Sequence, residues 1–590
     1  MSQIEIPYLI VGAGPAGASL ACFLASHGQT GIMVSMASGT AKEPRAHINN
    51  PAALECLREI GLEQDCLKVA TPQSHMQHTR WCHDVAGREL ARIHSWGNQP
   101  KRRGSYDAAS PCHHVDLPQT LLEPILVGHA TAKGWKIRFD TQFLNFTALS
   151  DGSVKSELKD LLSGTTYTIH SKYLFGCDGA RSQVIRQLDI PLDKKPGQGL
   201  AINLLVRADL HKHMRYRTGN LHWIFQPEVE HPPWGWTCVL RMVKAWDEWM
   251  FIILPEPGFE DLAVLPSEAD YLKRVRQLIG DDSVKVEILD ASKWYINEIV
   301  ATRYSEGNIF CLGDAVHRHP PFNGLGSNTC IQDAYNLAWK VAFVEKRLAS
   351  PTLLDTYSQE RQPVGAGVVQ RANQGLRDHM AVWEALGVLP TDVEERKRQH
   401  AELTAQLDAG QIRRKQLQEA VAYTEHEFGA IGIEMNLAYN SSAIYLKDEG
   451  RRPALPEDPV LHYQITTYPG SRLPHAWLND SIPDRAPVST QDVAGHGTFC
   501  LFTGNGGDSW QAAAKLVSSK TGIVINCVSI GWDQDYEDVY GDWARRREVA
   551  DDGAVLCRPD RIVCWRSMSA IENADEKLLQ VMQSVVGMAT

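Results

Sequence analysis

The sequence has no C-x-x-C pair, although it contains 13 cysteines among 590 residues. An odd number of scattered cysteines argues against a disulfide framework and against a structural zinc site. His317 and His319 have the spacing of two metal ligands, but no third ligand accompanies them, so we expect no metal. These absences predict a reducing compartment, most simply the cytoplasm.

The sequence also lacks a long hydrophobic run and an excess of basic residues. Its longest apolar stretches fall far short of the roughly 20 residues that a membrane-spanning helix needs. No basic segment or cleavage site accompanies the first apolar run, so we expect neither a membrane span nor a signal peptide. The net charge of −11 argues against a nucleic-acid partner, because phosphate binding requires clustered lysine and arginine.

A glycine-rich turn stands near the amino end, in the segment VGAGPAGASL. The apolar run from Tyr8 to Val11 predicts a buried strand, and the residues from Pro15 to His27 predict a helix after it. Gly12, Gly14 and Gly17 have the G-x-G-x-x-G spacing, which allows a tight turn, close approach of a pyrophosphate and close packing of the helix. The segment therefore predicts a dinucleotide site with phosphates at the helix N-terminus.

Ser35 stands where such a site usually carries an acidic residue. The usual carboxylate lies about 20 residues after the glycines, at the end of the second strand, and bonds the ribose. A serine hydroxyl can bond a ribose more weakly than a carboxylate. We therefore expect an altered adenosine contact and not the loss of the site.

Two further motifs follow the glycine turn. One is LFGCDGARS around Asp178 and Gly179, and the other is CLGDAVHRHPPFNGLGSNTCIQDAYNLAWK from Cys311 to Lys340. In this order the three motifs resemble those of class A flavoprotein monooxygenases, and within that class the phenol hydroxylase and chlorophenol hydroxylase branch. The resemblance covers nearly the whole chain. It implies an α/β fold with a FAD-binding domain of the glutathione-reductase type, an inserted β-sheet substrate domain and a C-terminal thioredoxin-like domain.

The resemblance also divides the chain into domains. The expected limits are residues 1–75, 110–195 and 295–385 for a discontinuous FAD-binding domain, 76–109 and 196–294 for the substrate domain, 386–440 for a helical connection, and 441–590 for the thioredoxin-like domain. Because the thioredoxin-like domain lacks C-x-x-C, we expect it to have a structural or dimer-contact role and no dithiol chemistry. We therefore expect a homodimer.

Local patterns predict helices within these domains. One covers the residues from Val115 to Ala132, and another continues past Leu348 to a break at Pro363. A solvated helix pair is expected between Asp392 and Glu427, where the chain is polar and charged.

Individual roles carry over from the resembling family. Asp314 is expected to bond the flavin ribityl chain, and Asp178 to serve both FAD and NAD(P)H. The turn and helix after Pro321 would face the flavin pyrimidine with N–H groups that stabilise negative charge. One departure is Ile185, which stands where the family has an arginine, with Arg186 beside it. The expected cofactor-binding residues are Gly12, Gly14, Ala16, Gly17, Ser35, Arg45, Gln119, Asp178, Gly179, Gly313, Asp314, Pro321, Gly324, Gly326, Ser327 and Asn328.

The resemblance implies a reaction in which NADPH or NADH binds transiently and reduces FAD. Reduced FAD takes up O2 as a C4a-hydroperoxide, which transfers oxygen to a small aromatic substrate, commonly ortho to a phenol hydroxyl. The protein would position the ring, exclude water and deprotonate the phenol.

Two residues are candidates for that deprotonation. His47 lies where the phenol hydroxylases place an acidic catalytic residue, and histidine titrates near neutrality. It could instead only bond backbone or flavin. Tyr295 lies between an aromatic block and the strand before Asp314. Six of the 16 tryptophans fall between residues 223 and 294, which favours either a pocket for a flat ring or ordinary core packing.

Other functions explain less of the sequence. A flavin halogenase would carry W-x-W-x-I-P, but only Trp234 and Trp236 of that pattern are present. A simple dehydrogenase would leave Asp178 and Asp314 without a role. A third class is a non-catalytic interaction protein built around the C-terminal domain, which a purified yellow protein that consumes NAD(P)H faster with a phenol present would exclude. The main rival is a tailoring monooxygenase of a polyketide-derived phenol, with hydroxylation, dearomatisation or Baeyer–Villiger insertion as its outcome. The sequence leaves this choice open.

Overall fold

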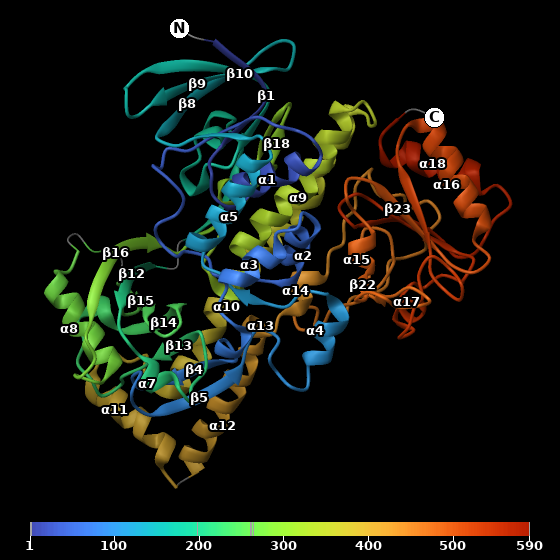
Figure 1. Ribbon diagram of the computed structural model, residues 1–590. Helices are drawn as coiled ribbons and strands as arrows, with labels where there is room; N and C mark the ends of the chain where they lie inside the picture. Colours follow the sequence, from blue (N-terminus) through green and yellow to red (C-terminus); the bar gives the residue numbers. More distant parts are fainter. Residues whose placement is uncertain (1–2, 197–198, 260–261, 263–264, 407, 589–590) are drawn as a thin grey trace.

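The structure, a computed structural model, describes residues 3–196, 199–259, 262, 265–406 and 408–588. Its elements form a mixed α/β fold in which two large sheets stand one above the other and a smaller C-terminal sheet lies to one side (Figure 1).

The first sheet carries the glycine-rich turn. Its strands lie in the order β18 (Ser305–Glu306), β19 (Ile309–Cys311), β10 (Thr166–Gly176), β1 (Gln3–Val11), β2 (Ile32–Val34) and β7 (Lys136–Arg138), with β8 (Thr141–Ala148) and β9 (Val154–Asp160) joined to β10. From β19 to β7 the neighbouring strands are parallel. Their carboxyl ends therefore meet at one edge, where ligands bind in sheets of this kind.

Three helices pack together beside this sheet: α1 (Pro15–Ser26), α5 (Gln119–Ala132) and α9 (Gly326–Glu345). The predicted strand from Tyr8 to Val11 is completely buried as the second half of β1. Strands of a parallel sheet covered on both faces form continuous apolar runs, which is why this one was predictable.

A short two-stranded sheet pairs β3 (Ile48–Asn49) with β6 (Val115–Asp116). The prediction of a helix from Val115 was wrong at its start, because α5 begins at Gln119. Pro118 explains the difference, since a proline disfavours helical conformation in the residue before it and is itself tolerated at a helix start.

The second sheet has seven strands. They lie in the order β16 (Glu287–Tyr295), β12 (Leu200–Arg207), β15 (Glu248–Leu254), β14 (Thr237–Lys244), β13 (Leu221–Ile224), β4 (His78–Cys82) and β5 (Glu89–His94). One face packs against α8 (Glu268–Ile279). The other face packs against the long helix α10 (Asp355–Leu386) and α12 (Asp408–Tyr423).

Helix α10 runs through Pro363, so the predicted break there was wrong. Proline costs about 3 kcal/mol in a helix interior. Buried residues on both sides of it, from Glu360 and Arg361 to Val368 and Val369, hold the helix in its packed path. The predicted helix pair is present as α11 (Val393–Ala401) and α12.

The C-terminal sheet has the order β24 (Ile525–Ser529), β23 (Phe499–Thr503), β25 (Ala554–Cys557) and β26 (Val563–Ser567). Helices α16 (Asp508–Thr521) and α18 (Ala574–Val585) pack together in the same core. The remaining α-helices of the described residues are α2 (Pro51–Glu59), α3 (Glu63–Val69), α4 (Arg103–Ala109), α6 (Gln183–Gln187), α7 (His211–Met214), α13 (Glu425–Phe428), α14 (Ile431–Met435), α15 (Thr490–Val493) and α17 (Asp542–Arg546).

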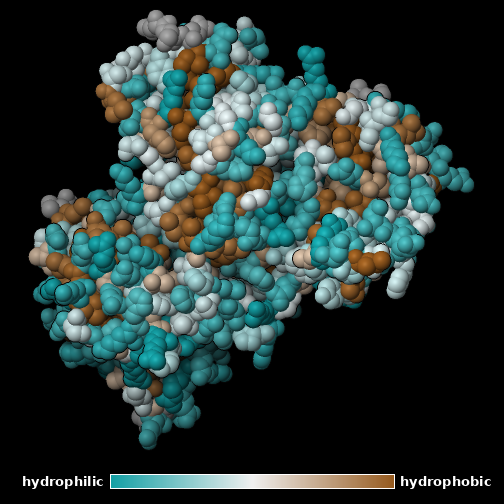
Figure 2. Space-filling model, viewed as in Figure 1, coloured by the Kyte–Doolittle hydropathy of each residue, from teal (hydrophilic) through white to brown (hydrophobic). Residues whose placement is uncertain are grey.

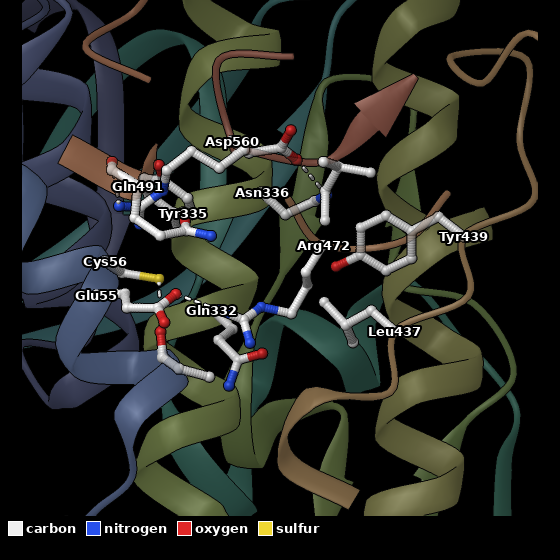
Figure 3. Close-up of a pocket in the computed structure, with 13 residues that line it drawn as sticks. Glu55, Cys56, Gln332, Tyr335, Asn336, Leu437, Tyr439, Arg472, Gln491 and Asp560 are labelled. Atoms are coloured by element: carbon white, nitrogen blue, oxygen red, sulfur yellow. Dashed lines mark hydrogen bonds and ion pairs between the residues drawn. The ribbon is translucent and has the colours of Figure 1, made fainter. Parts of the chain in front are cut away.

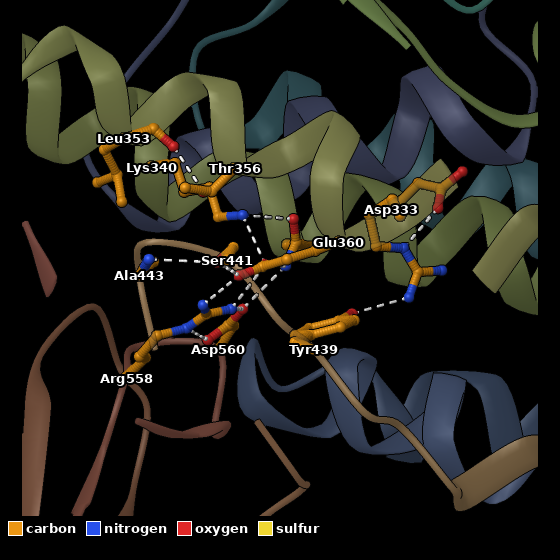
Figure 4. A network of polar contacts seen from close by, with 12 residues as sticks. Asp333, Lys340, Leu353, Thr356, Glu360, Tyr439, Ser441, Ala443, Arg558 and Asp560 are labelled. Carbon is orange, nitrogen blue, oxygen red and sulfur yellow. Dashed lines mark hydrogen bonds and ion pairs between the residues drawn. The ribbon is translucent and has the colours of Figure 1, made fainter. Parts of the chain in front are cut away.

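A buried ion-pair network joins the C-terminal part to α9 and α10 (Figure 4). Glu360 of α10 accepts hydrogen bonds from Lys340 of α9 at 2.7 Å and from Arg558 at 2.6 Å, and all three side chains are completely buried. Asp560 binds Arg558 from the other side at 2.6 Å. Because buried charges must be paired to be tolerated, this network fixes how these parts pack.

Apolar surface lies over α3 and α5 on one face of the molecule (Figure 2). Leu67 and Val69 of α3 are 40% and 45% exposed, and Leu121 of α5 is 40% exposed. The N-terminal part of α5 also reaches the glycine-rich turn, because Glu123 lies beside Gly14. Hydrophobic side chains thus lie close to the carboxyl edge of the first sheet.

Candidate active site

The glycine-rich turn follows β1 at the carboxyl edge of the first sheet. Gly12 has φ +109°, and a Cβ there would meet the carbonyl oxygen of Cys177 at 2.1 Å. A Cβ on Gly17 would meet the carbonyl oxygen of Gly12 at 2.0 Å, so α1 can pack this closely only with glycine. Gly14 precedes α1 and makes no side-chain cap, which leaves the first N–H groups of the helix for an anion.

Ser35 follows β2 at the same edge. The amide of Gly12 donates to the carbonyl of Val34 at 2.8 Å, which holds the ends of β1 and β2 side by side. The Ser35 hydroxyl accepts a hydrogen bond from the amide of Ala37 at 3.3 Å and is half-buried. Among the described residues nothing else bonds this hydroxyl, so its second lone pair and its proton are left for a ligand.

Asp178 and Gly179 follow β10, the next strand at this edge. The Asp178 Oδ2 atom accepts the amide of Gln183 at 2.6 Å, while Oδ1 is buried and has no partner among the described residues. Burial raises the pKa of this carboxyl. An orphaned buried oxygen beside a glycine turn fits a site that a bound polar group completes.

Gly313 and Asp314 follow β19, again at the carboxyl edge. Gly313 has φ +64°, and a Cβ there would meet Cys330 Sγ at 2.8 Å and the Ala16 methyl at 3.0 Å. The side chain of Asp314 is exposed and bonds no residue that the structure describes. Strands β1, β10 and β19 thus bring all three motifs together.

A tight turn leads from Pro321 into α9. Gly324 has φ +60°, and a Cβ there would meet Ile48 at 2.9 Å. Asn328 in the first turn of α9 donates to the carbonyl of Ile48 at 2.8 Å and accepts the amide of Asn50 at 2.9 Å. The start of α9 has no side-chain cap and is therefore open to a partially negative group.

His47 lies directly before β3, within reach of both large sheets. Its Nδ1 atom lies 3.0 Å from Oδ2 of Asp116 on β6, and the imidazole is 12% exposed. Arg241 of β14 in the second sheet hydrogen-bonds to the backbone carbonyls of Pro44 and Arg45. Burial, and then the charge of Arg241, lower the pKa of His47, so its imidazole is neutral at pH 7.

The amino-acid sequence matches the family model of a FAD binding domain over residues 5–372 and that of an aromatic-ring hydroxylase C-terminal domain over residues 466–589. The chain belongs to the FAD-dependent aromatic-ring hydroxylases. A 2,4-dichlorophenol 6-monooxygenase of Cupriavidus pinatubonensis is 42% identical over 587 residues, covering 99% of this chain and 97% of that protein. A phenol 2-monooxygenase of a Pseudomonas species is 40% identical and covers 98% and 92%.

A solved structure agrees with these matches. The flavin-dependent monooxygenase PieE, in complex with FAD and substrate, superposes with a TM-score of 0.93 at 38% identity, over 99% of this chain and all of that one. The open helix ends, the orphaned Asp178 oxygen and the exposed Asp314 carboxylate fit FAD. This hydroxylase is therefore a FAD-dependent monooxygenase.

The predicted residues differ in how close they come to His47. The backbone N–H of Gln119 donates to the carbonyl of Ala46 at 2.8 Å, so Gln119 lies beside the segment that precedes His47. The Arg45 side chain is 70% exposed, and its Nε atom lies 3.8 Å from a carboxylate oxygen of Glu43. Tyr295 ends β16, is 46% exposed and lies near Lys293. Because neighbours in a strand face opposite ways, Trp294 faces α10 and Tyr295 the other side.

The aromatic block divides between the two faces of the second sheet. Trp223, Trp236 and Trp294 lie on the face toward α10 and the His47 loop. Trp234, Trp246 and Trp249 lie on the opposite face, in the core beneath α8. Both groups pack in hydrophobic cores, and only the first group lies on the face toward the His47 segment, which the tryptophan density alone did not distinguish.

Three residues of the site gave no signal in the sequence: Asp116, Asn220 and Arg241. Asn220 donates to Asp116 Oδ2 at 2.7 Å and accepts from the indole N–H of Trp96 at 3.2 Å. Asp116 was hidden within a predicted helix. Its position two residues before Pro118 was the one available sign of an extended segment.

A cavity of about 40 Å³ lies between α2, α9 and the C-terminal part (Figure 3). A volume of about 40 Å³ has room for a few water molecules, each of which needs about 10–15 Å³, but not for an aromatic ring. Its charged side chains are already paired, Arg472 with Glu55 and Arg561 with Glu59. The cavity is therefore no candidate for the substrate.

Metal and membrane features complete the description of the site. Among the described residues, no cluster of three His, Cys, Asp or Glu side chains could bind a metal ion. His317 instead lies 2.8 Å from Asp333, and His319 bonds the carbonyl of Pro320 at 2.7 Å. Within the same described ranges, no helix is both long and apolar enough to cross a membrane.

Proposed function

We propose that this enzyme hydroxylates a phenol at the carbon ortho to its hydroxyl group, using O2 and NADPH or NADH. Support comes from relatives named for phenol and dichlorophenol that share 40–42% of their residues with nearly the whole chain. The observation that carries the proposal is His47, a neutral imidazole held between the FAD-binding motifs and the aromatic face of the second sheet.

FAD, when bound, supplies the activation of O2 and the transfer of oxygen. Gly12, Gly14, Ala16 and Gly17 would hold the pyrophosphate at the start of α1, and Ser35 the adenosine ribose. Asp314, beside Gly313, would bond the ribityl chain, and Asp178, with Gly179, would bind FAD and the nicotinamide cofactor. The remaining contacts to the flavin and its loop would come from Arg45, Gln119, Pro321, Gly324, Gly326, Ser327 and Asn328.

His47 acts on the substrate in this proposal. Its imidazole accepts the phenol proton, so that the oxygen becomes a phenolate and the ring gains electron density at the ortho carbon. Trp223, Trp236 and Trp294 would provide apolar walls for the ring and exclude water. Tyr295 faces the other side of β16 and is given no part in this step.

We also propose the domain limits stated above. Strands β4 and β5, from residues 78–94, share a sheet with β12–β16, which supports a substrate domain made of two segments. The mixed four-stranded sheet with α16 and α18 supports a thioredoxin-like C-terminal domain. A reducing compartment such as the cytoplasm is supported by 13 cysteines that are all free.

The test is mass spectrometry of the products that the purified enzyme forms from simple phenols and from polycyclic phenols. We expect one added oxygen, ortho to the hydroxyl, on simple phenols, and slower reaction on polycyclic ones. Turnover of polycyclic phenols alone, or ring-expanded products, would instead identify a tailoring monooxygenase. NAD(P)H oxidation that no phenol accelerates would contradict both.

A further inference from the structure

We propose that Asp116 is a positioning residue, which holds His47 with its Nε2 atom free for the substrate hydroxyl and balances the charge when that atom takes a proton. This inference rests on the proposed role of His47 as the base. Asp116 touches neither substrate nor cofactor, and it acts only through the imidazole.

The position of Asp116 is fixed by backbone pairing. In the β3–β6 pair, Ile48 lies opposite Asp116, and the amide of Leu117 donates to the His47 carbonyl at 2.6 Å. The Asp116 side chain is completely buried, and its Oδ2 atom lies 3.0 Å from His47 Nδ1. A distance of 3.0 Å is that of a hydrogen bond, and the pairing of β3 with β6 keeps the two side chains at this distance.

The direction of each hydrogen bond follows from the chemistry of the groups. The indole N–H of Trp96 can only donate, so Asn220 must turn its carbonyl toward Trp96 and its NH2 toward Asp116. The Oδ2 atom of Asp116 accepts from Asn220 and faces His47 as an acceptor, so His47 must carry its proton on Nδ1. The chain Trp96–Asn220–Asp116–His47 therefore leaves Nε2 as the unprotonated nitrogen.

The Nε2 atom is available to a substrate. It bonds no residue that the structure describes, and His47 keeps 12% of its side-chain surface exposed. In the reaction the phenol O–H bond breaks, its electron pair stays on the oxygen and its proton joins Nε2. The imidazolium keeps its Nδ1 proton, which stays hydrogen-bonded to Asp116, so the other side chains of the chain can stay in place.

Two charged groups face the imidazole, Asp116 from β6 and Arg241 from β14. Burial and Arg241 lower the pKa of His47, whereas Asp116 raises it. Without the carboxylate, the imidazole would be a weaker base and its protonated form would stand unbalanced beside Arg241. The effect of losing Asp116 must therefore depend on how readily the phenol gives up its proton.

Asp116→Asn tests this dependence. Oδ1 of Asp116 has no hydrogen-bond partner among the described residues, so an amide NH2 can take that place and leave a carbonyl facing His47 and Asn220. The variant removes the charge and keeps the shape. We expect hydroxylation of an ordinary phenol at pH 7 to slow roughly 10- to 100-fold, a part of the roughly 10²–10⁴-fold that a general base contributes.

The loss should shrink as pH rises toward the pKa of the phenol itself. It should also shrink for a phenol with electron-withdrawing substituents that ionises near neutrality. A merely structural defect would slow all phenols equally at every pH. Asp107→Asn is the matched control, because Asp107 is an exposed carboxylate of α4 that lies 3.9 Å from His113 and takes no part in the chain Trp96–Asn220–Asp116–His47.

Trp96→Phe is the second variant. It keeps an aromatic ring in the core and removes the N–H that orients Asn220. We expect a smaller loss with the same recovery toward high pH. Because this variant leaves both charges in place, it tests the hydrogen-bond chain even if Asp116→Asn folds poorly.

His47→Ala, measured alongside, separates the inference from the function on which it rests. A His47→Ala enzyme that hydroxylates at the parental rate across pH 6 to 9 would overturn both. If His47→Ala is slow and recovers at high pH, while Asp116→Asn and Trp96→Phe stay at the parental rate, only the positioning role fails. A loss in Asp116→Asn that is the same for every phenol and pH would also overturn it.

Discussion

At the scale of single residues, the two ends of the site are built differently. The cofactor end is built mainly from backbone turns and helix ends, and the carboxylate of Asp314 is exposed there. The substrate end consists of side chains, His47, Asp116 and Asn220, whose hydrogen bonds fix one another. A change at one end should therefore leave the other end in place.

Asp314→Ala should lose most of the FAD without unfolding the protein. The Asp314 carboxylate is exposed and bonds no described residue, so its removal leaves no buried group unpaired. The measurement is the ratio of flavin absorbance to protein after gel filtration. Asp151→Ala is the control, because Asp151 is exposed and, among the described residues, its side chain bonds Ser153 in the β8–β9 turn. An equimolar flavin content in Asp314→Ala would contradict the assignment.

At the scale of elements, α9 and α10 link the flavin motifs to the C-terminal part. Asp333 of α9 bonds His317 at 2.8 Å beside the Asp314 motif and Arg361 of α10 at 2.7 Å. Arg361 in turn donates to the hydroxyl of Tyr439 at 2.9 Å, and Glu360, one residue earlier, binds Arg558 (Figure 4). Helices α9 and α10 thus hold both the segment that follows Asp314 and the C-terminal part in place.

Arg558→Leu should destabilise the protein strongly. Removing one partner of a buried ion pair leaves Asp560 and part of the Glu360 charge uncompensated, which typically lowers the free energy of unfolding by about 3–5 kcal/mol. Thermal unfolding followed by circular dichroism measures the change. Arg398→Leu, in an exposed pair with Glu395, is the control and should leave the midpoint nearly unchanged. Equal midpoints for the two variants would show that the network contributes little.

The elements also show where prediction from sequence ends. The first strand, α1 and the helix pair after Asp392 follow from periodicity and composition, because their signals lie within one segment. Strand β6 has two residues and directly precedes a helical sequence pattern, so its residues were predicted as part of that helix. Helix α10 continues through Pro363 because the burial of residues on both sides of the proline outweighs the low helix propensity of proline.

At the scale of the whole molecule, the site lies where separate parts of the chain meet. His47 and Asp116 are 69 positions apart, and Asp116 and Asn220 are 104 apart. Gly12 and Gly313 adopt positive φ angles that favour glycine, so each requirement is visible as a glycine at one position of the sequence. The cofactor motifs were recognisable for this reason. The partners of His47 depend on how two sheets come together, and no single segment records that.

The central claim is that this molecule places one atom of O2 on a phenol. The most direct measurement is mass spectrometry of the product formed from phenol under heavy-isotope O2, with NAD(P)H consumption recorded in the same sample. We expect a catechol that carries one heavy oxygen atom, in an amount close to the NAD(P)H oxidised. Heavy isotope found only in hydrogen peroxide, or a product oxygen that comes from water, would contradict the claim.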